Sequence, residues 1–257
     1  EMLSCLVGSE MCIRDSVHPD PDELGRVYTP EISLACNSFD FLESALEQSV
    51  SVDRDLSPLR KNYYSWREPY ATPGSVKMEQ IVLQLNEVLA EDAIVANGAG
   101  NYAAWLHRYF QYKSFKTQLA PTSGSMGYGI PAAISAKLER PNTEVVCLAG
   151  DGCAQMSIQE FGTAVQYKAN IIIIISNNGV YGTIKMHQER TYPGRNSGTN
   201  MLNPDFASLA RSYGGFGETV EKTAEFLPAF ERARSAGKPA IIELKTNPLA
   251  LSPQTPA

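Results

Sequence analysis

The stretch at residues 150–179, GDGCAQMSIQEFGTAVQYKANIIIIISNNG, decides the fold of this chain. A short apolar run at 145–149 precedes it and is typical of a buried strand. The isoleucines at 171–175 are too apolar for a strand with one face in water, and they favour a parallel sheet covered on both sides. Between the runs, Ser157 and Glu160 have the spacing of a capping box and predict a helix start. The stretch therefore predicts a strand–helix–strand unit of an α/β fold.

The polar residues of this unit stand at its two strand ends. Asp151 and Asn178 follow the two predicted strands, and the carboxyl ends of parallel strands share one edge of a sheet. A carboxylate and an amide carbonyl are hard oxygen ligands that suit Mg²⁺, which completes its shell with phosphate and water oxygens. The amides of Gly152 and Cys153, in a tight turn before a helix, would face an anion. The unit therefore predicts a diphosphate bridged by a metal, since without the cation the carboxylate would repel the phosphates.

The GDG turn and the Asn177-Asn178 pair resemble the cofactor motif of thiamine diphosphate (ThDP) enzymes, most closely the acetolactate synthase-like branch. The resemblance covers about residues 17–248 and is most specific at 123–179. It implies that Mg²⁺ is held by Asp151, Asn178 and the backbone carbonyl of Val180. The residues that it implies for cofactor binding in this motif are Gly150, Asp151, Gly152, Cys153, Asn178, Val180, Tyr181 and Gly182.

Two other turns carry further cofactor residues by the same resemblance. Asn101 and Tyr102 follow a predicted strand and would help to hold the diphosphate, the alternative being a plain loop. In the SGSMGYG turn, the carbonyl of Gly124 would accept from the 4′-amino group of the aminopyrimidine, with Ser125 beside it. Met126 would wedge between the two cofactor rings; alternatively, it fills a gap in the core. Dinucleotide binding is disfavoured because no acidic residue follows a second strand as that motif requires.

The segment 181–200 resembles the family region that faces the substrate and acts as a lid, and its first half is expected to be helical. It carries Thr183 and His187 where acetolactate synthases typically have Met and Trp, and that Trp selects the second 2-oxoacid. His187 is a candidate acid–base group or substrate anchor, and the alternative is a structural or solvated side chain. Arg190 and Arg195 are candidates for binding a carboxylate.

Composition limits the other functions. The 257 residues carry a net charge of −6, which argues against nucleic acid as a partner. No apolar run reaches the length of a membrane span, so no membrane association is expected. The five cysteines have neither metal-ligand spacing nor a paired framework, which suits a reducing cytoplasm.

The chain divides into segments of different character. Residues 1–16 are expected to be a non-native leader, because 5–16 read like a translated sequencing adapter; a degenerate signal peptide or a natural tail are the alternatives. Cys5 and Cys12 would then be non-native, and the gene fragment would begin near Val17. The remaining segments are a middle-domain remnant at 17–50, a polar linker at 51–72, the ThDP-binding domain at 73–250 and a tail at 251–257.

Several local expectations concern helices. A helix over 41–46 would turn Phe41, Leu42 and Ala45 inward in the α/β remnant. Ser75 and Thr223 are expected to cap two helices of the main domain. That domain should contain a parallel sheet with helices on both faces.

The resemblance implies a ThDP- and Mg²⁺-dependent enzyme that decarboxylates 2-oxoacids and then joins the product to a second carbonyl. A simple 2-oxoacid decarboxylase, a noncatalytic ThDP-binding subunit and an unrelated nucleotide-binding domain are the alternatives. The family's activating glutamate comes from the pyrimidine-binding domain of a partner subunit, so Glu160 and Glu189 are not assigned that role. A homo-oligomer, dimer or tetramer, is therefore expected, and the chain by itself should have no turnover.

Overall fold

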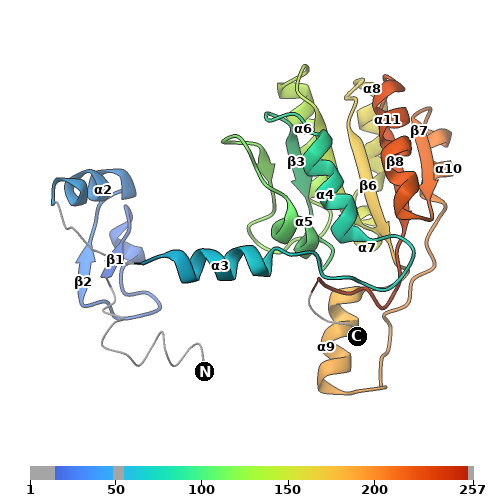
Figure 1. Cartoon of the computed structure of the whole chain (residues 1–257). Helices are drawn as coiled ribbons and strands as arrows, with labels where there is room; N and C mark the ends of the chain where they lie inside the picture. The colour runs from blue at the N-terminus through green and yellow to red at the C-terminus, as the bar shows by residue number, and fades with distance from the viewer. Residues whose placement is uncertain (1–14, 49–54, 254–257) are drawn as a thin grey trace. The chain divides into compact units, whose positions relative to one another are not determined.

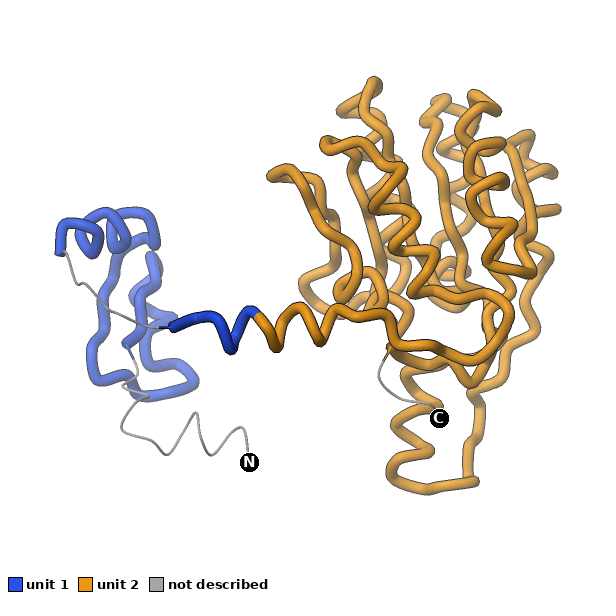
Figure 2. Tube along the Cα trace, in the orientation of Figure 1, with its two compact units in different colours: residues 1–60 blue, residues 61–257 orange. Residues whose placement is uncertain are grey.

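The computed structural model describes residues 15–48 and 55–253, so Cys5 and Cys12 of the expected leader lie outside the described residues. The chain forms two compact units, residues 1–60 and 61–257 (Figure 2). No element of the described residues is a helix long and apolar enough to cross a lipid bilayer.

The described part of the first unit is small and open. Strands β1 (Asp15–Val17) and β2 (Ile32–Leu34) pair in parallel, with the 3₁₀ helix η1 (Pro21–Glu23) between them and helix α2 (Ser38–Glu47) after them. This arrangement confirms the helix predicted over 41–46. The predicted inward face of that helix is wrong, because Phe41 and Leu42 are 37% and 58% exposed and Ala45 is also exposed. Two short strands offer too little surface to cover a helix face.

Helix α3 (Ser57–Trp66) occupies much of the stretch expected to be a polar linker, where no helix was predicted. Its start has recognisable signals. The Asp55 carboxylate accepts a hydrogen bond from the amide of Ser57 at 2.8 Å, and Pro58 lies in the first turn. Proline is tolerated there because the first turn has no intrahelical partners for its amides.

The second unit is built on a six-stranded parallel sheet in the order β4-β3-β5-β6-β8-β7 (Figure 1). The order places β4 and β7 at the two edges. The strands are β3 (Ile94–Asn97), β4 (Gln118–Leu119), β5 (Val145–Gly150), β6 (Ile172–Asn177), β7 (Phe216–Val220) and β8 (Ala240–Lys245). The helical elements are α4 (Met78–Val88), α5 (Ala103–Tyr109), α6 (Gly129–Glu139), α7 (Asp151–Gln155), η2 (Ile158–Glu160), α8 (Phe161–Gln166), α9 (Gly182–Thr191), α10 (Phe206–Ser212), η3 (Thr223–Glu225) and α11 (Phe226–Ser235).

Helices cover both faces of this sheet, which explains the uninterrupted isoleucines of β6. Ile172 and Ile174 belong to the core cluster formed with α4, α5 and α11. Ile173 and Ile175 point the other way, into the cluster formed with α6, α8 and α10. All four are at most 5% exposed, and burial of each isoleucine contributes about 1.5–3 kcal/mol. The predicted α/β fold with helices on both faces is confirmed.

The capping box predicted between β5 and β6 is wrong. A first helix, α7, begins already at Asp151, and η2 starts as predicted directly after Ser157, which is its N-cap, with α8 following. The side chain of Ser157 makes no capping bond; its hydroxyl donates instead to the carbonyl oxygen of Gly127, at 2.8 Å. The Ser157 hydroxyl, which the local sequence pattern predicted as a cap for the helix start, is therefore bonded to a residue distant in sequence.

The predicted caps at Ser75 and Thr223 are also wrong. Helix α4 follows Lys77 as its N-cap, and η3 follows Lys222. The Thr223 hydroxyl accepts from the amide of Lys77 at 2.8 Å and lies 3.1 Å from the carbonyl oxygen of Ser75, to which it donates. Thr223 thus satisfies a donor at the start of α4 rather than one in its own helix.

Candidate functional site

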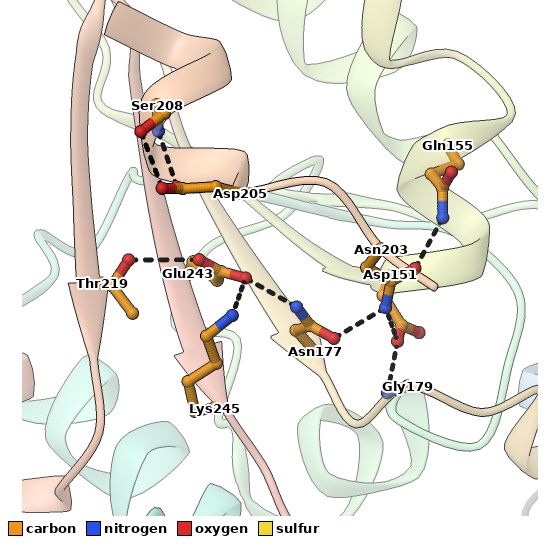
Figure 3. Close-up of polar contacts among 10 residues, drawn as sticks. All are labelled: Asp151, Gln155, Asn177, Gly179, Asn203, Asp205, Ser208, Thr219, Glu243 and Lys245. Carbon is orange, nitrogen blue, oxygen red and sulfur yellow. Dashed lines mark hydrogen bonds and ion pairs between the residues drawn. The ribbon is translucent and has the colours of Figure 1, made fainter. Parts of the chain in front are cut away.

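Asp151 stands at the carboxyl end of β5 and is only 3% exposed. Its Oδ1 accepts a hydrogen bond from the amide of Gly152 at 2.8 Å. Its Oδ2 accepts from the amide of Gly179 at 2.8 Å and from Nδ2 of Asn203 at 2.7 Å (Figure 3). The parallel register pairs Gly150 with Ser176, so the ends of β5 and β6 lie side by side as the sequence predicts.

The hydrogen bonds with defined distances place more donors on Oδ2 of Asp151 than on Oδ1. A carboxylate offers about four lone pairs, two on each oxygen. Two donors occupy Oδ2, whereas one donor occupies Oδ1. Burial raises the pKa of Asp151, and its hydrogen bonds oppose that rise. A cation beside Oδ1, the oxygen with fewer of these donors, would compensate the buried negative charge.

The oxygens beside Asp151 fit a magnesium ion. Asn178 and Val180 line the same cavity as Asp151, and Oδ1 of Asn178 accepts from the amide of Val180 at 3.1 Å. The described residues hold no group of three or more His, Cys, Asp or Glu side chains suited to a metal. A metal here would be coordinated by one carboxylate, together with a side-chain amide oxygen and a backbone carbonyl oxygen. Mg²⁺ accepts such a sparse set because water and phosphate oxygens complete its shell.

A cavity of about 90 Å³ opens at the ends of β5 and β6. A wider groove of about 450 Å³ runs along α6 and β4, but no predicted site residue lines it. The predicted residues that line the first cavity are Asn101, Tyr102, Met126, Gly150, Asp151, Gly152, Cys153, Asn178, Val180, Tyr181 and Gly182.

The SGSMGYG turn contributes one side chain to this cavity. Met126 lines it and is 40% exposed, so it is not a buried core methionine. Gly124 has a φ of +68°, a conformation that favours glycine. Neither Gly124 nor Ser125 lines the cavity, and the Ser125 hydroxyl lies 3.1 Å from that of Ser123. Their predicted role at the aminopyrimidine stays a prediction.

Tyr102 links three turns around the cavity. Its hydroxyl lies 3.3 Å from Sγ of Cys153, and the amide of Gly127 donates to the same sulfur at 3.2 Å. Its ring occupies the space that Gly150 leaves free, where an added Cβ would lie 2.7 Å from Cδ1. Burial raises the pKa of Tyr102 well above that of a free phenol, so the hydroxyl stays neutral.

The turn after β3 is also tied to α9. The Thr183 hydroxyl donates to Oδ1 of Asn101 at 2.9 Å, and it accepts from the amide of Asn101 at 3.2 Å. Thr183 and Ile184 line the cavity from the first turn of α9. The helix predicted over the first half of 181–200 is thereby confirmed.

The structure does not bring the predicted basic side chains to the cavity. His187 is exposed, and its Nδ1 lies 3.0 Å from a guanidinium nitrogen of Arg190. Arg195 is exposed and packs over the ring of Tyr192. None of these residues lines the cavity.

Several residues at the site were not predicted. Asn203 and Asn177 form the hydrogen-bond network of Asp151, and Trp105, Ala250 and Leu251 line the cavity. Asn203 lies in an irregular segment before α10 and carries no motif, so the sequence offers no signal for it. Asn177 belongs to the Asn177-Asn178 pair of the cofactor motif. The motif alone does not predict that the Asn177 side chain bonds to Asn203 and not to a ligand.

The chain is similar to known proteins of one family. The family model described as thiamine pyrophosphate enzyme, C-terminal TPP binding domain, matches residues 98–244, over half of the chain. The acetolactate synthase large subunit of Haemophilus influenzae is 32% identical over 227 residues, which is 84% of this chain and 40% of that protein. The same subunit of Cyanidium caldarium is 29% identical over 236 residues, covering 87% of this chain and 40% of that protein.

A solved structure is also similar. It is the thiamine diphosphate-dependent 4-hydroxybenzoylformate decarboxylase of Rhodococcus jostii RHA1, with a TM-score of 0.76 and 27% identity. The match covers 91% of this chain and 44% of that one. The chain thus spans about 40% of the length of these curated relatives.

Proposed function

This chain belongs to the thiamine pyrophosphate enzyme family, and on that premise we propose that it binds the diphosphate of ThDP together with Mg²⁺. The observation that carries the proposal is the buried Asp151 carboxylate, which lines a cavity at the ends of β5 and β6 together with Asn178 and Val180. Asp151, the side-chain oxygen of Asn178 and the carbonyl of Val180 would hold the metal. When bound, ThDP supplies the carbon centre that makes decarboxylation of 2-oxoacids feasible.

The chain's own residues support the cofactor in distinct ways. The ionised Asp151 accepts bonds and would hold a cation between itself and the phosphates. Tyr102 stays a neutral phenol that closes the wall beside Gly150 and brings no charge toward an anion. Met126, half exposed at the cavity, would contact the cofactor rings.

The size of the cavity supports a shared site. Its 90 Å³ is small beside the roughly 300–1,000 Å³ of sites that enclose a drug-sized ligand. In this proposal the chain holds one end of the cofactor, and a pyrimidine-binding domain of a partner subunit holds the other. A homodimer or tetramer in the cytoplasm is the assembly that we propose.

The proposed reaction is that of an acetolactate synthase-like enzyme, in which decarboxylation of one 2-oxoacid is followed by carboligation to a second. The similarity to acetolactate synthase large subunits supports it. The second candidate is a 2-oxoacid decarboxylase, favoured by the similarity to a solved decarboxylase. A noncatalytic ThDP-binding subunit is the third. Product analysis with pyruvate on the complete enzyme separates the first two, as acetolactate or acetaldehyde.

Calorimetric titration of the 257-residue chain with ThDP tests the cofactor proposal. Binding should require Mg²⁺ and be abolished by EDTA. Asp151→Ala should weaken binding by about 100-fold, because the metal loses its only carboxylate. Asp205→Asn, a carboxylate-to-amide change on the surface, is the control and should bind as the unchanged chain does. Equal affinity of Asp151→Ala, with or without Mg²⁺, would refute the metal–diphosphate site.

Turnover is a separate expectation. The chain by itself should not decarboxylate pyruvate, because the residue that activates ThDP is expected on a partner domain. Steady CO₂ release by this chain with ThDP and Mg²⁺ would contradict that expectation.

A further inference from the structure

Glu243 on β8 is a buried carboxylate that the proposed function does not use. It is 1% exposed and does not line the cavity. Its Oε1 accepts from Nδ2 of Asn177 at 2.6 Å and from Nζ of Lys245 at 2.5 Å. Its Oε2 accepts from the hydroxyl of Thr219 at 3.1 Å (Figure 3). A buried charge of this kind is retained only where its hydrogen bonds compensate its desolvation.

One branch of these bonds leads to the candidate metal site. Oδ1 of Asn177 accepts from Nδ2 of Asn203 at 2.7 Å. The same Nδ2 donates to Oδ2 of Asp151 at 2.7 Å. Glu243, Asn177, Asn203 and Asp151 thus form a continuous line of side chains across the ends of β8, β6 and β5 (Figure 3). Gln155 closes the network by donating from Nε2 to Oδ1 of Asn203, at 2.7 Å.

The two carboxylates at the ends dictate the direction of every bond between them. An ionised carboxylate only accepts, so Asn177 must turn its NH₂ group toward Glu243 and its oxygen toward Asn203. Asn203 must then turn its NH₂ group toward Asn177 and Asp151. Reversal of either amide would place an acceptor against an acceptor. The charge on Glu243 therefore fixes the orientation of the Asn177 and Asn203 amides, and Asn203 in turn donates to Asp151.

We propose that Glu243 is a positioning residue for the cofactor site, acting through Asn177 and Asn203 on the Asp151 carboxylate. The inference rests on the proposed function, in which Asp151 binds Mg²⁺. Asn203 and Gly179 both donate to Oδ2 of Asp151, whereas Gly152 donates to Oδ1. When Asn203 is not held as a donor, this difference between the two oxygens is lost. Metal affinity falls because the carboxylate loses its fixed orientation.

Three variants of the full chain test this direction of bonding. Glu243→Gln replaces a carboxylate, which can only accept hydrogen bonds, by an amide, which can also donate them. A glutamine at 243 can present its NH₂ group as well as its oxygen to Asn177, so the direction of bonding is no longer fixed. Asn177→Asp places two carboxylates against each other. Each single variant should weaken Mg²⁺-dependent ThDP binding by about tenfold or more. The double variant, E243Q with N177D, should recover most of the affinity. In it the new amide at position 243 donates to the new carboxylate at 177, whose second oxygen still accepts from Asn203.

Thr219→Val is the matched control. It removes a hydrogen bond to the same Glu243 carboxylate, but on the Oε2 side that does not lead to Asp151. It should lower the midpoint of thermal unfolding and leave ThDP affinity unchanged. A purely structural role of Glu243 predicts the opposite pattern, with affinity falling in every variant as stability falls. That pattern, or unchanged affinity in Glu243→Gln, overturns the proposal.

A crystal structure of the ligand-free Glu243→Gln chain tests the positioning separately from the cofactor. The hydrogen bond from Asn203 to Asp151 should be lost or shared between alternative amide orientations. A network with every bond and orientation retained overturns the proposal. If the unchanged chain fails to bind ThDP, the proposed function fails, whereas the crystal structure still decides whether Glu243 orients Asp151.

Discussion

The hydroxyl of Tyr102 lies 3.3 Å from the Sγ atom of Cys153, so the turn after β3 touches the turn after β5. The amide of Gly127 donates to the same sulfur and adds the turn before α6. Three loops far apart in sequence are therefore packed as one wall of the cavity. A change in the conformation of one loop should therefore displace the other two.

Gly98→Ala tests this packing. An added Cβ at position 98 would lie 2.3 Å from Sγ of Cys153 and 2.9 Å from the hydroxyl of Tyr102. Overpacking of this kind destabilises a protein by about 1–3 kcal/mol, which urea unfolding measures. The added change Cys153→Ala removes the sulfur and should restore part of the lost stability. A Gly98→Ala chain as stable as the unchanged protein would show that the wall is looser than described.

Phe161→Ala tests the core on the α8 side of the sheet. Phe161 is fully buried and stacks edge to face with Tyr213, the ring centroids being 6.0 Å apart. Its loss should reduce the free energy of unfolding by about 3–5 kcal/mol. Leu202→Ala is the control, because that side chain is 100% exposed and its removal should change stability by less than about 0.5 kcal/mol. Similar effects of the two substitutions would contradict the assigned burial.

The N-cap of α10 predicts a pH dependence. Hydrogen bonds from the amide and hydroxyl of Ser208 lower the pKa of Asp205. A carboxyl whose pKa is lower in the folded state contributes stability above its unfolded pKa, and that contribution disappears as the pH falls through the folded pKa. Asp205→Ala should therefore cost about 0.5–2 kcal/mol at neutral pH. The difference should shrink as the pH falls below about 4.

Asp205→Asn separates the charge from the cap in the same urea titrations. Asparagine is as good an N-cap as aspartate, so this variant should keep the capping bond without the ionisable group. Its stability relative to Asp205→Ala should not vary with pH. A gap between the unchanged chain and Asp205→Ala that persists undiminished in acid would contradict the role of the carboxylate charge.

Arg108 should control the segment that closes the cavity near the end of the described chain. Its guanidinium donates to the carbonyl oxygen of Pro253 at 3.0 Å and to that of Trp66 at 2.6 Å. It also stacks over the ring of Trp66 at 5.1 Å. Ala250 and Leu251, just before Pro253, line the cavity.

Arg108→Ala should therefore accelerate hydrogen exchange in residues 248–253 and weaken ThDP binding. Arg108→Lys should not rescue either effect, because an ammonium lacks the planar fork that reaches both carbonyls. The matched control is Arg232→Ala, which removes an exposed guanidinium paired with Glu218. Unchanged exchange in Arg108→Ala would show that other contacts hold the segment.

Cys147 and Cys36 should differ in reactivity. Burial raises the pKa of the Cys147 thiol, and this residue of β5 is fully buried in the core. Cys36 is half-buried. Iodoacetamide should therefore label Cys36 and spare Cys147 in the folded chain, because the thiolate is the reactive form. Mass spectrometry of labelled peptides measures both sites, and labelling of both in urea is the control.

Much of the fold follows from the sequence because its signals are local. The isoleucines of β6 have no polar alternation, so a sheet with both faces covered is the arrangement that buries them all. The position of Asp151 at a strand end follows from the same pattern. Helical turns do begin at Ile158 and Thr223, but the side-chain caps predicted at Ser75, Ser157 and Thr223 were wrong, because the hydroxyl or carbonyl group has a partner far away in sequence.

By itself, then, the sequence determined the α/β class, the strand ends and the pair Asp151 and Asn178 at one sheet edge. Only the tertiary structure decided that Asn203 holds Oδ2 of Asp151 and that Glu243 orients the network behind it. The reason is physical. Hydrophobic periodicity is a local property of the sequence. The direction of a hydrogen bond, in contrast, depends on which donors and acceptors meet when distant segments are packed together.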